Sequence, residues 1–283
     1  MENKMKTFGI PAAILFLVLA AFFSYDSYKH VKTDNAQISA HFLMLSSRVN
    51  GTISKVFVED HQKVKAGDVL AQIDTSDYSN AKTAAFAQAS ALEARVNEAR
   101  VNFSRAEELI KNQAISKERF DKALADFRDL DAKLKAAKSL AEQAGLNESY
   151  TKIIAPNDGI IARKSVEPGQ FVSAGQPLFG FVAENKRWVV ANLKETELQE
   201  VRLGQTVNIH VDALAGQKFI GKVVSIAPST GAVFSLLPPD NATGNFTKVV
   251  QRIPVKIELV NLSEKDIEAL QLGLSAIVSI VVH

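Results

Sequence analysis

The side chains of this chain best suited to metal binding or proton transfer are its five histidines, which are dispersed along the sequence. None of them forms a His-Glu-x-x-His motif or a comparable ligand spacing; they are His30, His41, His61, His210 and His283. His210 and Asp212 alternate on an expected strand and so share one face, where we favour an ordinary surface pair over a metal site. The histidines therefore predict no metal centre.

The chain also lacks residues and motifs of common enzymes. It has no cysteine, which excludes disulfides, thiolate nucleophiles, cysteine-bound zinc and iron–sulfur clusters. Neither a Gly-x-Gly-x-x-Gly nor a Gly-x-Ser-x-Gly motif occurs. Thirty-three basic and thirty-one acidic residues give a net charge of +2, which argues against nucleic-acid binding. We therefore expect a protein that is not an enzyme and that binds no cofactor.

Two segments of the chain repeat each other. Residues 51–70 align without gaps to residues 159–178 and are identical at nine of twenty positions. Each copy has the pattern of short strands, with turns marked by glycines: Gly51, Gly67, Gly159 and Gly175. Neither copy, at about 30 residues, could bury its apolar face alone. We therefore predict that the halves 41–77 and 149–184 close over each other as a small two-sheet sandwich with pseudo-twofold symmetry.

The chain between these halves, residues 78–148, follows a helical period. Residues 68–144 contain neither glycine nor proline, which favours long helices. Sixteen apolar residues recur in alternating steps of three and four, the spacing of a coiled-coil seam. Half of them are alanine, and the others are Leu92, Val96, Phe103, Ile110, Phe120, Phe127, Leu130 and Leu134. A break at 113–115 predicts an antiparallel coiled-coil hairpin with arms of about 45–50 Å.

The N-terminal region has the pattern of a membrane anchor. Residues 7–25 carry no charge, and a helix of this length spans about 28 Å, close to the thickness of the bilayer core. Two lysines before it favour a cytoplasmic segment at 1–6 and an exported remainder. A cleaved signal peptide is the alternative, but no small-x-small cleavage site follows before Ser24. We expect a retained single-pass anchor, then a linker and first strand at 26–40.

The C-terminal region, residues 185–283, returns to a β pattern. Its expected elements are a short helix at 194–200 and strands at 188–193, 206–211, 219–226, 253–259 and 276–282. Five short strands in about 100 residues predict a compact β-barrel. A loop at 229–247 is rich in Gly, Pro, Asn and Thr, and its Leu236-Leu237 pair is either exposed or packed under the barrel.

These parts, in this order, resemble the HlyD/EmrA-type membrane fusion proteins, which are periplasmic adaptor subunits of Gram-negative efflux and secretion systems. The resemblance rests on the anchor, the segment Thr33-Asp34-Asn35-Ala36, the split Gly-x-Ile…Val-x-Ala-Gly half-motif and the following barrel. Residues 236–259 look closest to the EmrA branch, whose members work with major-facilitator drug transporters. The resemblance implies a mainly β protein with a split lipoyl-like (barrel-sandwich hybrid) domain, anchored in the inner membrane with its bulk in the periplasm.

The resemblance also implies a docking site at the hairpin turn. Members that dock TolC-like outer-membrane channels carry Arg-x3-Leu-x6-Ser there, and Arg105, Leu109 and Ser116 stand at this spacing. Leu109 would offer an apolar contact, while Arg105 and Ser116 would donate hydrogen bonds to the channel rim. In the alternative interpretation, Ser116 caps the second arm and Arg105 pairs with a nearby glutamate. Capping and docking are compatible in Ser116.

We therefore expect an adaptor for the efflux of drugs or other toxic compounds. Its implied partners are an inner-membrane transporter of the major-facilitator type, a TolC-like channel and copies of itself in a ring of three or six. An adaptor of an ABC transporter in type I protein secretion, a membrane-tethered lipoyl or biotinyl carrier and a structural envelope tether remain alternatives. A carrier needs a lysine on a short turn between the halves, where this chain has its helical insertion.

Overall fold

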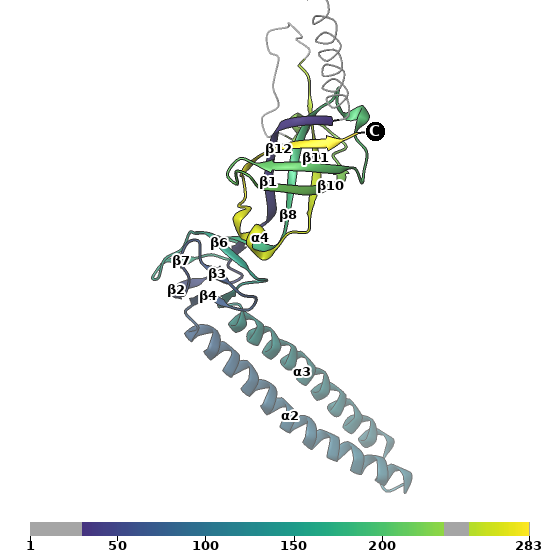
Figure 1. Cartoon of the computed structure of the whole chain (residues 1–283). Coiled ribbons are helices and arrows are strands. Elements are labelled where there is room, and N and C mark those ends of the chain that lie inside the picture. Colours follow the sequence, from purple (N-terminus) through teal and green to yellow (C-terminus); the bar gives the residue numbers. More distant parts are fainter. Residues whose placement is uncertain (1–29, 235–248, 283) are drawn as a thin grey trace, which may run out of the picture. The chain divides into compact units, whose positions relative to one another are not determined.

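The computed structural model describes residues 30–234 and 249–282 (Figure 1). These residues form two compact units, one of residues 42–182 and one that combines residues up to 41 with residues from 183 onward. The expected anchor at 7–25 lies outside the described residues, as does most of the loop 229–247 with its leucine pair. None of the helices in the described ranges is long and apolar enough to cross a bilayer.

The unit of residues 42–182 contains the predicted sandwich. Its strands are β2 (Gly51–Val56), β3 (Lys63–Val64), β4 (Val69–Ile73), β5 (Lys152–Ile154), β6 (Gly159–Lys164) and β7 (Phe171–Val172). Strands of the first half pair antiparallel with strands of the second, β4 with β5, β2 with β7 and β3 with β6. One sheet has the order β5-β4-β2-β7. The predicted closure of one half over the other is confirmed.

Reciprocal hydrogen bonds show the pseudo-twofold symmetry of the halves. The Ile53 amide donates to the Gln170 carbonyl at 2.8 Å, and the equivalent Ile161 amide donates to the Gln62 carbonyl at 3.0 Å. Each half thus completes the backbone hydrogen bonding of the other, and buried backbone groups require such partners.

The repeated glycines serve two different purposes in the sandwich. Gly67 and Gly175 occupy equivalent turns with φ of +88° and +85°, a backbone conformation that favours glycine. Gly159 lies where a Cβ would overlap backbone and aromatic atoms, and a Cβ on Gly51 would lie 2.6 Å from a neighbouring methyl. The first pair therefore shapes the turns, and the second pair permits close packing.

Two long helices, α2 (Ser76–Lys111) and α3 (Lys117–Ser149), pack along each other (Figure 1). An ion pair of 2.9 Å joins Lys138 Nζ to Glu93 Oε1 across the pair, and another near the base joins the start of α2 to the end of α3. The helices therefore run antiparallel. Within 85–110 and 120–144, every seam position is buried or half-buried, and every other residue except Leu124 is exposed.

In the described residues, six strands form a β-barrel that belongs to the second unit. They are β1 (His30–Ser46), β8 (Pro177–Lys194), β9 (Thr206–Val211), β10 (Lys218–Ile226), β11 (Arg252–Val260) and β12 (Ser275–Val281). Residues 42–46 of β1 and 177–182 of β8 belong to the first unit. Their order is β1-β12-β9-β10-β11-β8, and β1 also pairs with β8, which closes the ring. The predicted barrel is confirmed, but it contains a sixth strand, because β1 adds to the five expected from the C-terminal pattern.

Three short helical segments connect the barrel strands. η1 (Leu198–Glu200) occupies the end of the segment expected as a helix at 194–200, and η2 (Gly231–Phe234) follows β10. α4 (Glu264–Ala269) begins with a capping box in which the side chains of Ser263 and Asp266 satisfy each other's backbone amides. The hydrogen bonds from Ser263 lower the pKa of Asp266.

The barrel core consists mainly of aliphatic side chains, which alternate with exposed residues on β9. Leu193, Ile209 and Ile257 are fully buried. Arg187 is also buried; its guanidinium donates to the carbonyls of Leu270 and Ala183 at 3.0 and 2.8 Å. Burial lowers the pKa of Arg187, and the two carbonyls provide hydrogen bonds that replace those from water.

Candidate functional site

The predicted docking residues lie around the turn between α2 and α3. α2 ends at Lys111, and the amides of Gln113 and Ala114 then donate to the carbonyls of Ile110 and Leu109 at 3.0 and 2.8 Å. Gln113 adopts a φ of +55°, which lets the chain reverse within a few residues. The turn is therefore short and hydrogen-bonded.

Ser116 caps α3, as one interpretation of the sequence expected. Its hydroxyl oxygen accepts a hydrogen bond from the Arg119 amide at 3.3 Å, and its backbone is extended. Glu118 lies in the first turn of the helix, where a negative charge is favourable. Because capping uses only the oxygen as acceptor, the exposed hydroxyl of Ser116 can still donate to a partner.

Arg105 and Leu109 are both exposed on the last turns of α2, and Leu109 is 45% exposed. Their neighbours Ala106 and Ile110 are buried and half-buried between the helices. Within the described part of the chain Arg105 forms no ion pair with a glutamate, so the pairing that the alternative interpretation expected is not observed. Arg105 and Leu109 are thus available at the surface near the turn.

Phe103 is the centre of the apolar contacts next to this turn. Its ring stacks on Phe127, with centroids 5.8 Å apart and 6° between the planes, and lies tilted against Phe120 at 5.7 Å. Farther from the turn, Val96 and Leu134 are buried. The remaining large seam residues are half-buried: Leu92, Ile110 and Leu130.

The four histidines that the structure describes do not gather into a site. His210 is exposed on β9, with Lys218 and Ile277 as its register partners on the neighbouring strands. Among residues 30–234 and 249–282, no group of three His, Asp or Glu side chains is arranged to hold a metal ion. The turn that would carry a lipoyl or biotinyl lysine is replaced by α2 and α3.

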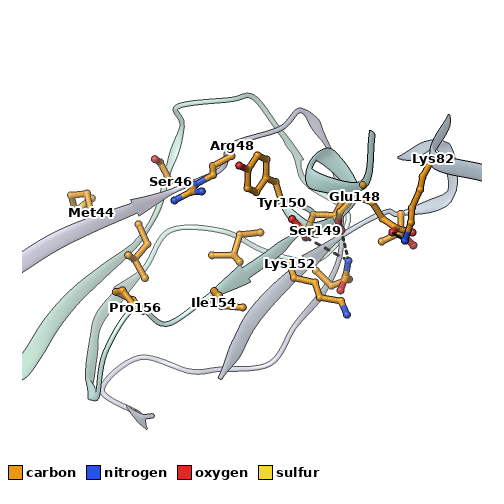
Figure 2. A pocket seen from close by; sticks show the side chains of 16 residues that line it. Met44, Ser46, Arg48, Lys82, Glu148, Ser149, Tyr150, Lys152, Ile154 and Pro156 are labelled. Carbon is orange, nitrogen blue, oxygen red and sulfur yellow. Dashed lines mark hydrogen bonds and ion pairs between the residues drawn. The ribbon is translucent and has the colours of Figure 1, made fainter. Parts of the chain in front are cut away.

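An open groove of about 1190 Å³ lies at the base of the hairpin, and we call it the basic groove (Figure 2). Its charged residues are Arg48, Lys82, Glu148 and Lys152. Lys82 Nζ lies 2.7 Å from Glu148 Oε2, and this hydrogen bond is the main cause that lowers the pKa of Glu148. Arg48 lies over the Tyr150 ring, with its Cζ 5.0 Å from the centroid.

A second groove of about 550 Å³ is lined by Asp74 and Asp77 at the start of α2, and we call it the acidic groove. Asp74 Oδ1 accepts hydrogen bonds from the Ser76 amide and hydroxyl at 2.9 and 2.7 Å. These bonds lower the pKa of Asp74, which favours its charged form. Phe171 of β7 also lines this groove and is 64% exposed.

No motif in the sequence indicated the basic groove. The lining residues of the basic groove come from 44–48, 72–82 and 145–156, three stretches that come together only when the two repeat halves close. No motif or period connects such residues along the chain.

Two known domain families match this chain. The RND MFP barrel-sandwich hybrid domain matches residues 43–184, and the CusB-like β-barrel domain matches residues 186–233. The multidrug export protein EmrA of Haemophilus influenzae is 33% identical, over 97% of this chain and 82% of that protein. The colistin resistance protein EmrA of Acinetobacter baumannii is 30% identical, over 99% of this chain and 96% of that protein.

A solved structure of the periplasmic adaptor protein EmrA matches the fold with a TM-score of 0.50 at 20% identity, covering 90% of this chain and 99% of that one. At this identity the likeness concerns the fold alone. It agrees with the sandwich and barrel described above.

Proposed function

The chain belongs to the family of membrane fusion proteins, and on this premise we propose that it is a periplasmic adaptor of a tripartite efflux system. The observation that carries the proposal is the similarity to EmrA proteins over nearly the whole chain, together with the split sandwich that the family match covers. Its relatives are export and resistance proteins, and the chain is not an enzyme.

We propose drugs and other toxic compounds as the cargo, because the relatives are named for multidrug export and colistin resistance. The similarity to EmrA proteins favours a transporter of the major-facilitator type in the inner membrane and a TolC-like channel in the outer membrane. An ABC transporter that secretes proteins is the alternative partner, and identification of the co-purifying transporter distinguishes the two.

The proposal assigns a place to each part of the chain. In order, these are a cytoplasmic end at 1–6, an inner-membrane anchor at 7–25, a linker and strand at 26–40, lipoyl-like halves at 41–77 and 149–184, the hairpin at 78–148 and the barrel at 185–283. Copies of the chain would associate into a ring of three or six, since a conduit must be closed on all sides.

We propose that α2 and α3 form a coiled-coil stalk. The burial pattern supports this, because residues in alternating steps of three and four face the partner helix and the rest face solvent. The exposed positions of Arg105, Leu109 and Ser116 near its turn support docking to the channel at this end.

Crosslinking in intact cells, followed by identification of the co-purifying proteins, tests the partners. We expect a transporter of the major-facilitator type and an outer-membrane channel. Recovery of an ABC transporter would move the assignment to protein secretion, and recovery of neither class of transporter would contradict the proposal.

Charge and polarity changes at the turn test the docking site. Arg105→Asp or Leu109→Ser should abolish export while folding and membrane attachment remain intact. Arg95→Asp and Val101→Ser make the same changes at exposed positions of α2 farther from the turn and serve as matched controls. Drug tolerance is measured in a strain that depends on this protein; full tolerance with both turn variants would show that the site is wrong.

A further inference from the structure

The strand register shows which connecting segments lie at the end of the barrel where β1 begins. His30 pairs with Val281 at the end of β12, and Ile280 of that strand pairs with Val207 at the start of β9. The pairings of β9 with β10, β10 with β11 and β11 with β8 continue around the barrel. The described segments that meet there, which we call the β1 end, are 194–205, 227–234 and 249–252.

The β1 end carries exposed aliphatic residues. Leu203, Val233 and Val249 are 66%, 68% and 67% exposed, and Val250 beside them is 46% exposed. In the described part of the barrel unit, the next most exposed large apolar residue is Ile220 on β10, at 51%. The large apolar residues that the barrel exposes most therefore lie at one of its ends.

The position of Leu203 is fixed by a hydrogen-bonded turn. Gly204 follows it with a φ of +83°, and the Gly204 amide donates to the Val223 carbonyl at 2.8 Å. On the other side, the Arg202 amide donates to Gln205 Oε1 at 2.8 Å. Leu203 therefore cannot turn into the barrel core without the loss of backbone hydrogen bonds.

We propose that the β1 end contacts the periplasmic surface of the inner membrane and inserts the side chains of Leu203, Val233 and Val249 between the lipid headgroups. The occupant to which this inference commits is the lipid surface itself. It rests on the anchor at 7–25 in the proposed function, and it adds the residues of the barrel that touch lipid.

The length of chain between the anchor and the barrel supports a lipid contact. Five residues lead from Tyr25, the last residue of the anchor, to His30, and even fully extended they span at most about 18 Å. The headgroup layer on each side of a bilayer fills a third or more of that reach. Because the tether keeps the β1 end so close to the membrane, even a weak contact with lipid would be well populated.

The charges of the β1 end balance, so the contact should be apolar rather than electrostatic. Segments 194–205, 227–234 and 249–252 contain three cations and three carboxylates: Lys194, Arg202, Arg252, Glu195, Glu197 and Glu200. Exposed aliphatic side chains at the rim of a domain can bind the headgroup boundary through the burial of apolar area alone. We therefore expect little dependence on anionic lipid or on salt.

Nitroxide labels on the full chain in phosphatidylcholine vesicles test this contact. The chain has no cysteine, so one substitution gives one label. Gly231→Cys places it at the β1 end, where an added Cβ meets no atom within 4 Å, and Gln271→Cys places it at an exposed turn before β12, at the opposite end. Oxygen concentrates in lipid, whereas a nickel chelate stays in water. The ratio of oxygen to chelate collisions should be at least about threefold higher at residue 231 than at residue 271.

Aspartate substitutions test the aliphatic residues themselves. Leu203→Asp together with Val249→Asp should lower the ratio at residue 231 to that at residue 271, because a carboxylate is costly to insert below the headgroups. The chain should stay on the vesicles through its anchor. Ile220→Asp together with Ile277→Asp makes the same changes at exposed positions on the barrel strands and should leave the ratio unchanged.

The inference is overturned if residues 231 and 271 give the same ratio in the parent chain, or if the aspartates at the β1 end change nothing. A high ratio that requires added phosphatidylglycerol would show an electrostatic contact in place of the aliphatic one. A label at residue 231 that leaves water only when a purified transporter is added would show that the β1 end binds that protein instead of lipid.

Two outcomes separate this inference from the proposed function. A chain that stays on the vesicles with a label in water at residue 231, and that still crosslinks to a transporter in cells, is an adaptor without the lipid contact. A chain that does not stay on the vesicles would contradict the anchor, and both the anchor and the lipid contact would be wrong.

Discussion

The barrel and the helical hairpin of this protein differ in what their residues bury. Leu193, Ile209 and Ile257 are fully enclosed in the barrel. The buried residues of the hairpin are mostly alanines, such as Ala89 and Ala137, and most of its large seam residues are only half-buried. Because hydrophobic stabilisation is about 25 cal/mol per Å² of buried apolar surface, each seam layer of the hairpin gains less than a barrel layer.

This difference suggests that the barrel is held by its own core, whereas the hairpin depends on helix length, its cap and ion pairs between the helices. The two regions also carry separate spectroscopic probes. Trp188, the only tryptophan, lies on β8 of the barrel, and α2 and α3 contain most of the helical residues in 30–234 and 249–282. Tryptophan fluorescence therefore follows the barrel, and helical circular dichroism follows the hairpin, in one urea titration of the full chain.

The largest effect is expected from a cavity in the barrel. Ile257→Ala removes a fully buried side chain and should lower the free energy of unfolding measured by Trp188 fluorescence by about 2–5 kcal/mol. The helical transition should be unaffected. Ile277→Ala, at a residue of β12 that is 45% exposed, is the matched control and should change the free energy of unfolding little. An equal shift of both transitions would show that barrel and hairpin unfold together.

A substitution in the seam should destabilise the hairpin and leave the barrel unchanged, and its effect should be smaller. Phe103→Ala removes the contacts with Phe120 and Phe127, and because Phe103 is half-buried we expect a loss of about 2 kcal/mol, below the range for a fully buried phenylalanine. The helical transition should shift to lower urea, while Trp188 fluorescence keeps its midpoint. Val101→Ala, at an exposed position of the same helix, is the control. A shift in the fluorescence midpoint with Phe103→Ala would contradict the independence of the two regions.

The sequence predicted those parts of the fold whose residues follow a period or a repeat. Nine identities in twenty positions predicted the sandwich, because two copies of an incomplete β unit must bury their faces on each other. The barrel was also predicted, but its strand β1 was placed in a linker and first strand at 26–40, since a single strand far from the others carries no signal of its partners. Only its pairing with β12 and β8 shows that it closes the barrel.

The candidate sites also differ in whether the sequence indicated them. Arg105, Leu109 and Ser116 were found because a resemblance supplied their spacing, and the cap at Ser116 follows from local chemistry. The basic groove was not found, because Arg48 precedes the hairpin in the sequence whereas Glu148 and Lys152 lie at its end or after it. A surface assembled by tertiary pairing has no linear pattern.

Substitutions of Ser116 can separate its role as the cap of α3 from its proposed role in docking, and they should lower stability only moderately. Ser116→Ala removes the cap of α3 and should lower the stability of the helical transition by about 1 kcal/mol. Ser116→Asp keeps an acceptor for the Arg119 amide but cannot donate, so it should retain the helical stability. If docking needs the donor, both variants lose drug tolerance; tolerance lost only with Ser116→Ala would show that capping is the sole role.

The smallest effect concerns the ion pair at the hairpin base and its dependence on pH. The hydrogen bond from Lys82 is the main cause that lowers the pKa of Glu148 below its ordinary value of 4.5. The Glu148 carboxyl therefore binds its proton less tightly in the folded chain than in the unfolded chain. The contribution of Glu148 to the stability of the fold is present above pH 4.5 and is lost as the pH falls through the lowered pKa.

Glu148→Gln removes this titration, so the urea midpoint of the helical transition should fall less in the variant than in the parent as the pH drops below 4.5. Glu98→Gln, at an exposed glutamate of α2, is the control and should keep the pH dependence of the parent. Since the ion pair of Lys82 and Glu148 joins only α2 and α3, the unfolding transition measured by Trp188 fluorescence should be the same in the variant and the parent. Identical helical pH profiles for Glu148→Gln and the parent would show that the contact between Lys82 and Glu148 does not stabilise the hairpin base.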